Sequence, residues 1–391
     1  MGRGVWLTAA GLAAALLSGG RARAEDAAPT PPPVLAIEAN ETIDFWRNTH
    51  GGLKTGYTTL NKLRLSATFD GSRAGLTGWR AHVQVFRANG ESLSGGRLGD
   101  IQTASNIEAY SVTRLMDAWV ERDFGSHGLI RAGIQDLNLD FDSIDAAGLF
   151  VNSSHGIAPD LSQTGANGPS IFPEGALSVE AIWTPRPNLS LKLAAFDGVP
   201  GDPAHPKAFV GVKLSAKDGA LIIGEADYKP TPDTLIAVGA WGYTADFDRI
   251  APGAAPSHGQ RGAYAFVQTK IPGGWSGWVR AGFADERVNP ISAYVGGGLV
   301  HAGLRTNDQF GLAIAHAVIG APARQRDGLP SAETNFEATY SLQVRPWFTL
   351  QPDIQYVVHP ALGAGTPNAL AIGLRVIIDL KHPADAAFGD D

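Results

Sequence analysis

The chain has 391 residues, with 48 glycines, nine tryptophans and no cysteine, which excludes disulfide bonds and thiolate metal sites. It carries 31 Lys and Arg against 38 Asp and Glu, a formal net charge of −7, so nucleic acid is not expected as a partner. The glycine- and aromatic-rich composition, without long helix-favouring runs, favours an all-β fold.

The amino-terminal segment has the layout of a secretory signal. Arg3 precedes an apolar run over 5–17, and a small-residue pattern, Ala-Arg-Ala, ends at position 24, as a cleavage site requires. The apolar run is too short for a permanent membrane helix. We therefore expect residues 1–24 to be a signal peptide removed on export, and the Pro-rich residues 25–37 to be a lead-in to the fold.

The rest of the chain alternates apolar and polar residues with period two, which is the pattern of β-strands. In the segment 334–345, for example, Phe336 and Tyr340 alternate with Glu337 and Thr339. We find no break in composition and predict one unit over 38–380. The expected strands cover 38–48, 58–70, 77–88, 113–123, 129–138, 176–184, 189–196, 220–228, 234–243, 262–271, 275–284, 292–303, 309–319, 334–345, 347–358 and 369–380.

Short connections alternate with long ones along this series. The short ones include 124–128, 185–188, 229–233, 272–274, 304–308 and Pro346; the long ones are 89–112, 139–175, 197–219, 244–261, 285–291, 320–333 and 359–368. The strands of a soluble β-sandwich also have one apolar face, which packs against a second sheet. A sandwich does not, however, require short and long connections to alternate. The pattern predicts an all-β, transmembrane antiparallel β-barrel of 16 strands, with short periplasmic turns and long external loops.

Aromatic residues near strand ends, such as Trp183, Trp275 and Trp347, fit this fold, because such rings favour the headgroup zone of a membrane. Two segments fit less well. Residues 208–217 alternate like a strand but would place two short turns in succession, so we assign them to an extended hairpin within a long loop. Pro352 lies inside a predicted strand of a barrel without free edges, so a bulge is expected there.

The polar faces are expected to line a water-filled lumen, because sixteen strands are too many for side chains to fill the barrel. Parity places both charge signs on this wall, Arg64, Arg80, Arg131 and Glu121 among them, together with the aromatic Trp119. This mixture suits an uncharged, hydroxyl-rich solute, since Arg, Asp and Glu all hydrogen-bond to sugar hydroxyls while their charges partly cancel.

The longest loop, 139–175, is expected to fold inward and narrow the lumen. It carries short polar groups, including Asn152, Asp160 and Gln163, and three prolines that stiffen it against collapse. A constriction needs both properties, because it must hold its shape and contact the solute.

Four blocks of sequence carry a family resemblance. They are GDIQTASNIEA (99–109), WVERDFGSHGLIRAGIQDLNLDFD (119–142), GLFVNSSHGIAPDLSQTGANGPSIFP (148–173) and AAFDGVPGDP (194–203). These blocks resemble the corresponding ones of the carbohydrate-selective outer-membrane porins, the OprB family. The resemblance implies a sixteen-stranded barrel in the outer membrane of a Gram-negative cell that passes glucose and related sugars passively.

The resemblance also implies which residues act. It places Asn152, Asp160 and Gln163 near the narrow part of the pore, and it extends a pore role to Arg131 and Asp136. The partners expected are small sugars and outer-membrane lipid, with no cofactor and no metal. A homotrimer is a candidate assembly, because trimers are common among sixteen-stranded porins.

The carboxyl terminus departs from the family pattern. Such barrels usually finish on an aromatic residue that closes the last strand, whereas here the last predicted strand ends at Leu380 and a polar tail, 381–391, follows. This departure concerns the signal for membrane insertion and leaves the fold prediction unchanged.

Three other functions stay open. The first is a barrel of the same architecture that passes small anions or general solutes. The second is a glycosidase or calcium site built on Asp136, Asp140, Asp142 and Asp145, but the spacing lacks the EF-hand pattern, and we do not expect an enzyme. The third is a secreted, β-rich carbohydrate-binding protein, which would stay in the aqueous fraction without detergent.

Overall fold

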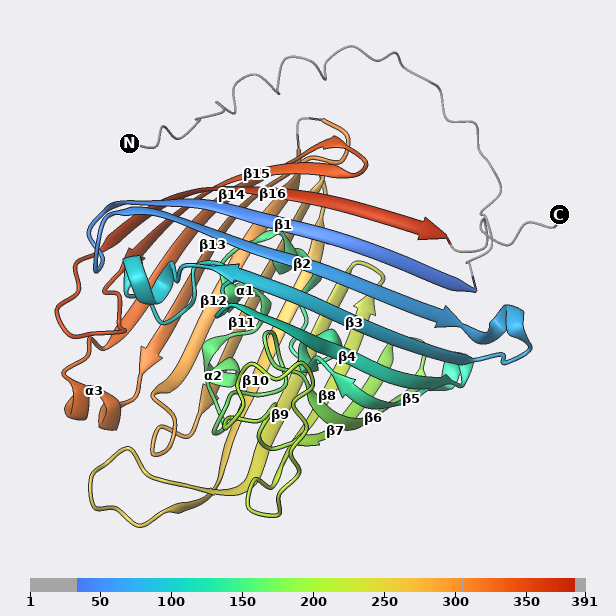
Figure 1. Cartoon of the computed structure of the whole chain (residues 1–391), viewed down its shortest axis with the longest axis horizontal. Coiled ribbons are helices and arrows are strands. Elements are labelled where there is room, and N and C mark those ends of the chain that lie inside the picture. The colour runs from blue at the N-terminus through green and yellow to red at the C-terminus, as the bar shows by residue number, and fades with distance from the viewer. Residues whose placement is uncertain (1–33, 304, 384–391) are drawn as a thin grey trace, which may run out of the picture. The chain divides into compact units, whose positions relative to one another are not determined.

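The computed structural model describes residues 34–303 and 305–383, and in this part of the chain sixteen antiparallel strands close into a barrel (Figure 1). The strands are β1 (Leu35–His50), β2 (Gly56–Asp70), β3 (Trp79–Gly90), β4 (Val112–Asp123), β5 (Gly128–Gln135), β6 (Ala176–Arg186), β7 (Leu189–Asp197), β8 (Ala220–Thr231), β9 (Thr234–Phe247), β10 (Ser257–Ile271), β11 (Trp275–Ala284), β12 (Ile291–Ala302), β13 (Gln309–Ile319), β14 (Ala332–Arg345), β15 (Phe348–Val358) and β16 (Ala369–Pro383). Each strand pairs with its neighbours in sequence, and β1 pairs with β16. The predicted fold class is confirmed.

Short helical segments lie in the connections. They are η2 (Gly71–Ala74), η3 (Ser94–Leu98), η4 (Gly125–His127), η5 (Leu137–Leu139), η6 (Asp145–Leu149), α1 (Ser153–Gly156), α2 (Pro159–Ser162) and α3 (Ala321–Asp327). Among the described residues, none of the helices has the length and apolar character needed to cross a membrane.

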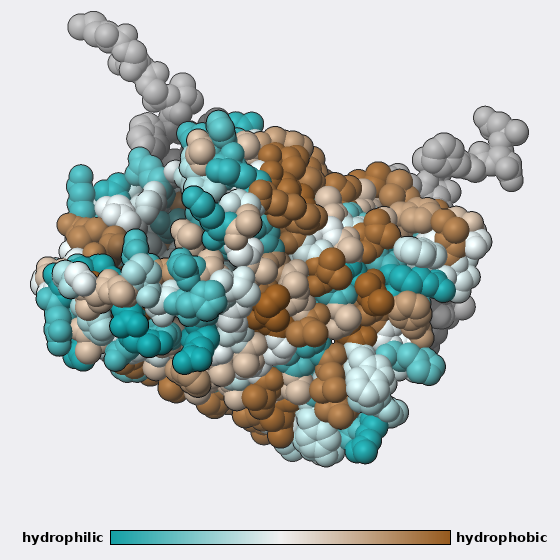
Figure 2. Space-filling view, turned by 90° about the horizontal axis from the view of Figure 1, so that it is seen from below, coloured by the Kyte–Doolittle hydropathy of each residue, from teal (hydrophilic) through white to brown (hydrophobic). Residues whose placement is uncertain are grey.

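Polar side chains face the inside of the barrel and apolar ones face out. On β14, for example, Glu333, Asn335 and Glu337 are buried, whereas Phe336 between them is exposed. Figure 2 shows brown, hydrophobic side chains spread over the strand region of one face, with hydrophilic ones gathered at one end. This arrangement is the reverse of a soluble protein and matches the alternation expected of a membrane barrel.

Inward-facing rings lie across glycines of the neighbouring strand. Trp46 pairs directly with Gly373, where an added Cβ would meet the indole at 2.6 Å. Tyr264 pairs with Gly239, where a Cβ would meet the phenol ring at 2.3 Å. Glycine at these positions therefore lets a large ring lie flat on the inner wall.

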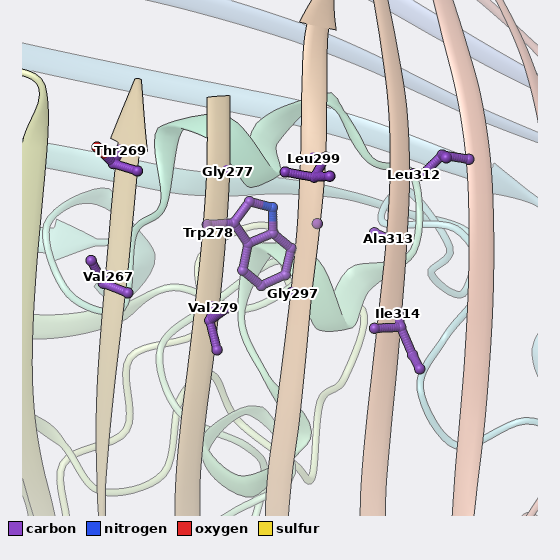
Figure 3. Close-up of a pocket in the computed structure, with 11 residues that line it drawn as sticks. Val267, Thr269, Gly277, Trp278, Val279, Gly297, Leu299, Leu312, Ala313 and Ile314 are labelled. Carbon is purple, nitrogen blue, oxygen red and sulfur yellow. The ribbon is translucent and has the colours of Figure 1, made fainter. Parts of the chain in front are cut away.

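On the outside, glycines leave the backbone bare. A shallow depression of the outer wall between β10 and β13 is drawn in Figure 3, with Gly277 and Gly297 on neighbouring strands. The Trp278 indole is nearly buried behind it. The rest of the depression is lined largely by apolar side chains, Val267, Val279, Leu299, Leu312, Ala313 and Ile314. The outer wall thus stays apolar where side chains are missing.

The element boundaries differ from the prediction at several places. β5 ends at Gln135 rather than at 138, because the Asp136 side chain accepts a hydrogen bond from the Asn138 N–H and caps η5. β1 begins at Leu35 and β16 extends to Pro383, so parts of the predicted lead-in and tail belong to strands. The predicted signal peptide and residues 384–391 lie outside the described residues.

The predicted bulge at Pro352 is wrong. Pro352 pairs with Leu374 of β16 without a change of register, and its carbonyl accepts a hydrogen bond from the Thr339 hydroxyl of β14 at 3.3 Å. The ladder to β14 skips this position and resumes in the same register. The missing N–H of proline is therefore accommodated by an interrupted ladder rather than by an extra residue.

The segment 208–217 is not a barrel strand, as expected, but it does not form the predicted hairpin either. Its one bridge is the parallel pair of Gly201 and Val212. The alternation that suggested a strand belongs instead to an extended loop segment whose apolar side chains remain exposed.

Candidate functional site

Two loops make contact with inward-facing side chains of the barrel wall. The first, residues 136–175, connects β5 to β6 and is called the long loop; it contains η5, η6, α1 and α2. The second, residues 91–111, connects β3 to β4 and is called the second loop; it contains η3. In Figure 1 the green α1 and α2 are seen between the strands of the barrel.

Buried ion pairs fix the long loop to β11. The Arg280 guanidinium donates to both carboxylate oxygens of Asp142, at 3.1 and 2.8 Å, and also to Asp160. The Arg280 and Asp160 side chains and that of Asp142 are almost completely buried. Because an unpaired buried charge is strongly unfavourable, these three groups stabilise one position of the loop together.

Backbone groups of the long loop bind a carboxylate of β14. Glu337 accepts hydrogen bonds from the N–H groups of Val151 at 2.6 Å and Asn152 at 3.0 Å. The Asn152 side-chain amide donates to Gln355 of β15 at 3.2 Å, and the Tyr294 hydroxyl of β12 donates to the Ser154 carbonyl at 3.1 Å. The middle of the loop is therefore held by three neighbouring regions of the wall.

The second loop is fixed to the inner wall in a similar way, by carboxylates of β14 and β1. Glu333 of β14 accepts hydrogen bonds from the N–H groups of Ile101 at 2.9 Å and Gln102 at 3.1 Å. Asp44 of β1 pairs with Arg375 of β16 at 2.7 and 2.8 Å and accepts a hydrogen bond from the Ser105 hydroxyl at 2.6 Å. Charged side chains of the wall thus bind N–H and hydroxyl groups of the second loop.

The two loops also bind each other. The Asn106 N–H donates to the Val151 carbonyl at 2.8 Å, and the Ser153 N–H donates to the Thr103 carbonyl at 2.9 Å. The Gln163 side chain donates to the carbonyl of Ile101. The loops therefore form one layer rather than two independent flaps.

A cavity of about 510 Å³ lies between the two loops and the strands β1, β2 and β16. Its charged groups have both signs, Lys62 and Arg375 against Glu108 and Asp136. The Lys62 ammonium lies 4.6 Å from the centre of the Phe172 ring. The remaining lining is mainly polar: Thr42, Gln102, Thr103, Asn106, Ile107, Asn138, Ser153, Ser154, Gly156, Ile157, Ser162, Gln163, Ile171 and Pro173.

The carboxyl group of Asp136 titrates near neutral pH. Burial, and secondly the neighbouring carboxylate of Asp117, raise the pKa of Asp136 to about 7, while Lys62 acts in the opposite direction. The charge that Asp136 contributes to the cavity therefore changes around neutrality.

A second cavity of about 700 Å³ lies where η6 faces the short-turn ends of the strands. Asp145, Ala146, Gly148 and Leu149 of the long loop line it together with strand and turn residues. The long loop therefore borders one cavity near its α1 and α2 segments and another near η6.

An ionic ladder runs along the inner wall of β3 to β6. Arg80 pairs with Glu121 at 2.5 Å, and Glu121 pairs with Arg131 at 2.7 Å. Arg131 continues the ladder to Glu180 at 3.4 Å and lies 4.7 Å from the ring centre of Trp119. The charges of this wall are mutually compensated, yet Arg80 remains 43% exposed.

The structure distributes the predicted site residues over three places. Asp136 and Gln163 line the 510 Å³ cavity. Asn152 and Asp160 are buried in the contacts that hold the long loop. Arg80, Trp119, Glu121 and Arg131 belong to the ladder and its neighbours, and Arg64 is half-buried on β2. The pore role of each residue stays a prediction.

Sequence reasoning missed two parts of this site. Lys62 has the same parity as Arg64 on β2, so the alternation contained the signal for its inward position. The second loop, with Asn106 and Glu108, was marked only by the family resemblance of block 99–109, because much of its contact with the long loop is made by carbonyls and N–H groups, which any residue supplies.

Two of the four aspartates that suggested a glycosidase or calcium site are engaged in ion pairs. Asp140 pairs with Arg131, and Asp142 pairs with Arg280. His155 lies between the rings of Phe150 and Trp278, with centroids at 5.0 and 5.5 Å, and burial lowers the pKa of His155 to about 3. Within residues 34–303 and 305–383, no cluster of three or more His, Asp or Glu is placed to hold a metal ion.

Comparison with known proteins gives a family and a fold. The model of the carbohydrate-selective porin family OprB matches residues 54–380. A structure of Pseudomonas putida OprB at high pH superposes with a TM-score of 0.78 at 19% identity, covering 88% of this chain and 94% of that chain. The Acinetobacter baumannii outer-membrane channel DcaP gives a TM-score of 0.56 at 9% identity, covering 88% and 96%. A search of curated proteins found no match.

Proposed function

The chain belongs to the carbohydrate-selective porin family OprB, and we propose that it passes glucose-type sugars by passive diffusion through a lumen narrowed by the long loop. The family and the barrel are those of outer-membrane channel proteins. Specific to this proposal are the kind of sugar, the constriction by the loop, and the residues that contact the solute.

The observation that carries the proposal is the composition of the 510 Å³ cavity. Lys62 and Gln163 offer hydrogen-bond donors, and Glu108 and Asp136 offer acceptors. Sugar hydroxyls both donate and accept, so they can replace lost water contacts at such a wall. The ring of Phe172 adds an apolar surface for the C–H face of a sugar.

Balanced charges disfavour a strongly ion-selective pore. Arg375 and Lys62 face the cavity together with Asp136 and Glu108, and Arg375 is already paired with Asp44. A permeating anion would meet attraction and repulsion within the same 510 Å³ space. An uncharged solute meets neither, which favours sugars over the alternative of a small-anion porin.

The proposal also assigns the orientation. Residues 1–24 act as a signal for export, the short turns face the periplasm, and the long loops face the exterior, as in membrane barrels generally. The outward-facing apolar side chains contact outer-membrane lipid. A homotrimer remains the candidate assembly.

Liposome swelling tests the proposal. Purified protein is reconstituted, and the rates for glucose, gluconate and glucosamine, which are similar in size and differ in charge, are compared. We expect glucose to enter fastest. Equal rates for all three would support a general diffusion pore, and faster entry of gluconate would support an anion channel; either result would contradict the sugar preference.

A further inference from the structure

A segment of another loop lies beside the edge of β4. The long loop begins after Gln135, so β5 is shorter than β4. Ala118 of β4 pairs with Ile134 of β5, and the residues of β4 between Val112 and Ala118 have no partner on β5. The Leu115 N–H of this unpaired stretch donates to the Phe209 carbonyl at 2.8 Å. The loop between β7 and β8 thus supplies a partner for the edge that the long loop leaves open.

The same loop segment continues over outward-facing residues. Leu214, Ser215 and Ala216 line one concavity together with Leu177 and Val179 of β6, which point away from the lumen. Ile134, which has the parity of outward-facing Ile130, is 9% exposed where Ile130 is 48% exposed. This difference is expected where a segment covers the upper outer face of β5.

The segment 209–216 exposes apolar rather than polar side chains. Phe209, Val210, Val212 and Leu214 are between 43% and 65% exposed. Connecting loops in water usually present polar groups, and contiguous exposed apolar side chains mark an interaction surface. The segment is also continuous with the apolar outer wall of β6 and β7.

The concavity under this segment has a volume of about 540 Å³. Small residues form much of its lining, and its larger apolar groups come from β6, from Phe196 of β7 and from Leu214. The residues are Ala132, Gly133, Leu177, Ser178, Val179, Ala195, Phe196, Asp197, Leu214, Ser215, Ala216, Gly219 and Ala220. A flat protein surface would leave this notch empty, whereas a flexible hydrocarbon chain can enter it.

Basic residues interleave with this apolar segment. Lys207, Lys213 and Lys217 are three of the nine lysines of the chain, and all three are exposed. Lys213 lies 3.8 Å from Asp202, whose other oxygen binds His205 at 2.8 Å. Among the described residues, the side chains of Lys207 and Lys217 make no ion pair or hydrogen bond with protein.

We propose that the loop 198–219 and the notch beneath it bind a phosphorylated glycolipid of the outer leaflet, with an acyl chain in the notch and phosphate on the lysines. The choice of leaflet rests on the orientation given under the proposed function. Ammonium groups next to a hydrocarbon-accepting surface complement an anionic amphiphile. Asp197, Asp202 and Asp218 are the acidic groups nearby, and Asp202 is already engaged by Lys213 and His205.

Native mass spectrometry of the full protein in detergent tests this proposal. The probes are a bisphosphorylated, acylated glucosamine disaccharide, the same glycolipid without its phosphates, and phosphatidylglycerol. The first variant combines Lys207→Gln, Lys213→Gln and Lys217→Gln, and the second, Ala195→Phe, fills the notch. The control combines Lys229→Gln and Lys270→Gln, which removes lysines at the short-turn ends of the strands.

We expect the triple variant to lose affinity for the phosphorylated glycolipid on the order of 100-fold, because each lysine near an anionic lipid contributes roughly 1 kcal/mol. Ala195→Phe should weaken both forms of the glycolipid, and the control should bind like the parent. Unchanged conductance of the triple variant and of Ala195→Phe shows that the barrel is intact.

Three results would overturn the proposal. One is unchanged glycolipid binding by the triple variant. Another is equal binding of phosphatidylglycerol with the same loss in the triple variant, which would make the site one for any anionic lipid. The third is a changed oligomeric state without a change in lipid binding, which would make the segment a subunit interface. Because no free, permeating sugar is added, failure of sugar selectivity leaves this test unaffected.

Discussion

The inner wall carries two kinds of charged side chain. Arg280 of β11 and Glu337 of β14, like Arg131 of β5, are buried and hold the long loop. Arg80 of β3 stays partly exposed, and Lys62 of β2 borders the 510 Å³ cavity. The same residue types therefore do two different jobs, fixing the loop where they are buried and facing the solute path where they are not.

The difference follows from what compensates each charge once it loses its hydration. A buried charge such as Arg280 must find complete pairing, and the loop carboxylates and N–H groups supply it. A charge facing a wet cavity keeps part of its hydration and contributes little to stability. Substitutions of buried and of partly exposed charges should therefore separate stability from permeation.

The largest effect is expected at Arg280. Arg280→Leu leaves the buried carboxylates of Asp142 and Asp160 without their partner, at a cost of about 3–5 kcal/mol. The long loop should then detach from β11, so that single-channel conductance rises while thermal stability falls. Heat-dependent electrophoretic mobility and planar-bilayer recording measure the two effects.

The matched control is Arg287→Leu. Arg287 pairs with Asp285 at 2.5 Å in the connection between β11 and β12, and the Arg287 side chain is 48% exposed. Neither stability nor conductance should change measurably. If Arg287→Leu had the same effect as Arg280→Leu, the distinction between buried and exposed charges would not hold.

A smaller effect is expected from pH at the cavity. The raised pKa of Asp136, about 7, means that its carboxylate is charged above this pH and neutral below it. Falling pH should therefore shift ion permeability toward anions by about two- to fivefold, because it removes a negative charge from the cavity. Reversal potentials between pH 6 and pH 8 measure this shift.

Asp136→Asn supplies the control for that measurement. At every pH, this variant should show the ion selectivity that the parent protein shows at low pH. It should therefore lose most of the pH dependence of its ion selectivity. A pH dependence that persists unchanged in Asp136→Asn would assign the titration to another group.

The smallest stability effect is expected at Arg80. Arg80→Gln removes one end of the ladder with Glu121, but Glu121 keeps Arg131 at 2.7 Å. Because the Arg80 side chain is 43% exposed, the loss should stay below about 1 kcal/mol. Denaturant unfolding checks this expectation, and a loss comparable to that of Arg280→Leu would contradict the comparison.

Much of the fold was predictable because it depends on local alternation. A period of two, repeated between short and long connections, requires no knowledge of distant contacts, and it led to all sixteen strands of the described barrel. Pro352 shows the limit of such rules. The sequence indicated that one hydrogen bond between strands is missing at Pro352. Whether the strand then forms a bulge or an interrupted ladder depends on the strands on both sides of it.

The site was less predictable, because its residues come together through the loops. Asp160 and Gln163 are three positions apart, yet Asp160 is buried against Arg280 while Gln163 lines the cavity. Polarity alone could not separate these roles. Partners such as Arg280 stand 120 residues away from Asp160 in sequence, and no period connects them.

Cysteine labelling at Lys62 tests the central claim most directly. The chain has no cysteine, so Lys62→Cys offers a single thiol at the cavity between loops and wall. A charged methanethiosulfonate added to the reconstituted channel should lower its current, and glucose should slow the reaction, while Leu193→Cys on the outer wall should give no change. Labelling of Lys62→Cys that leaves both current and glucose passage intact would contradict the account.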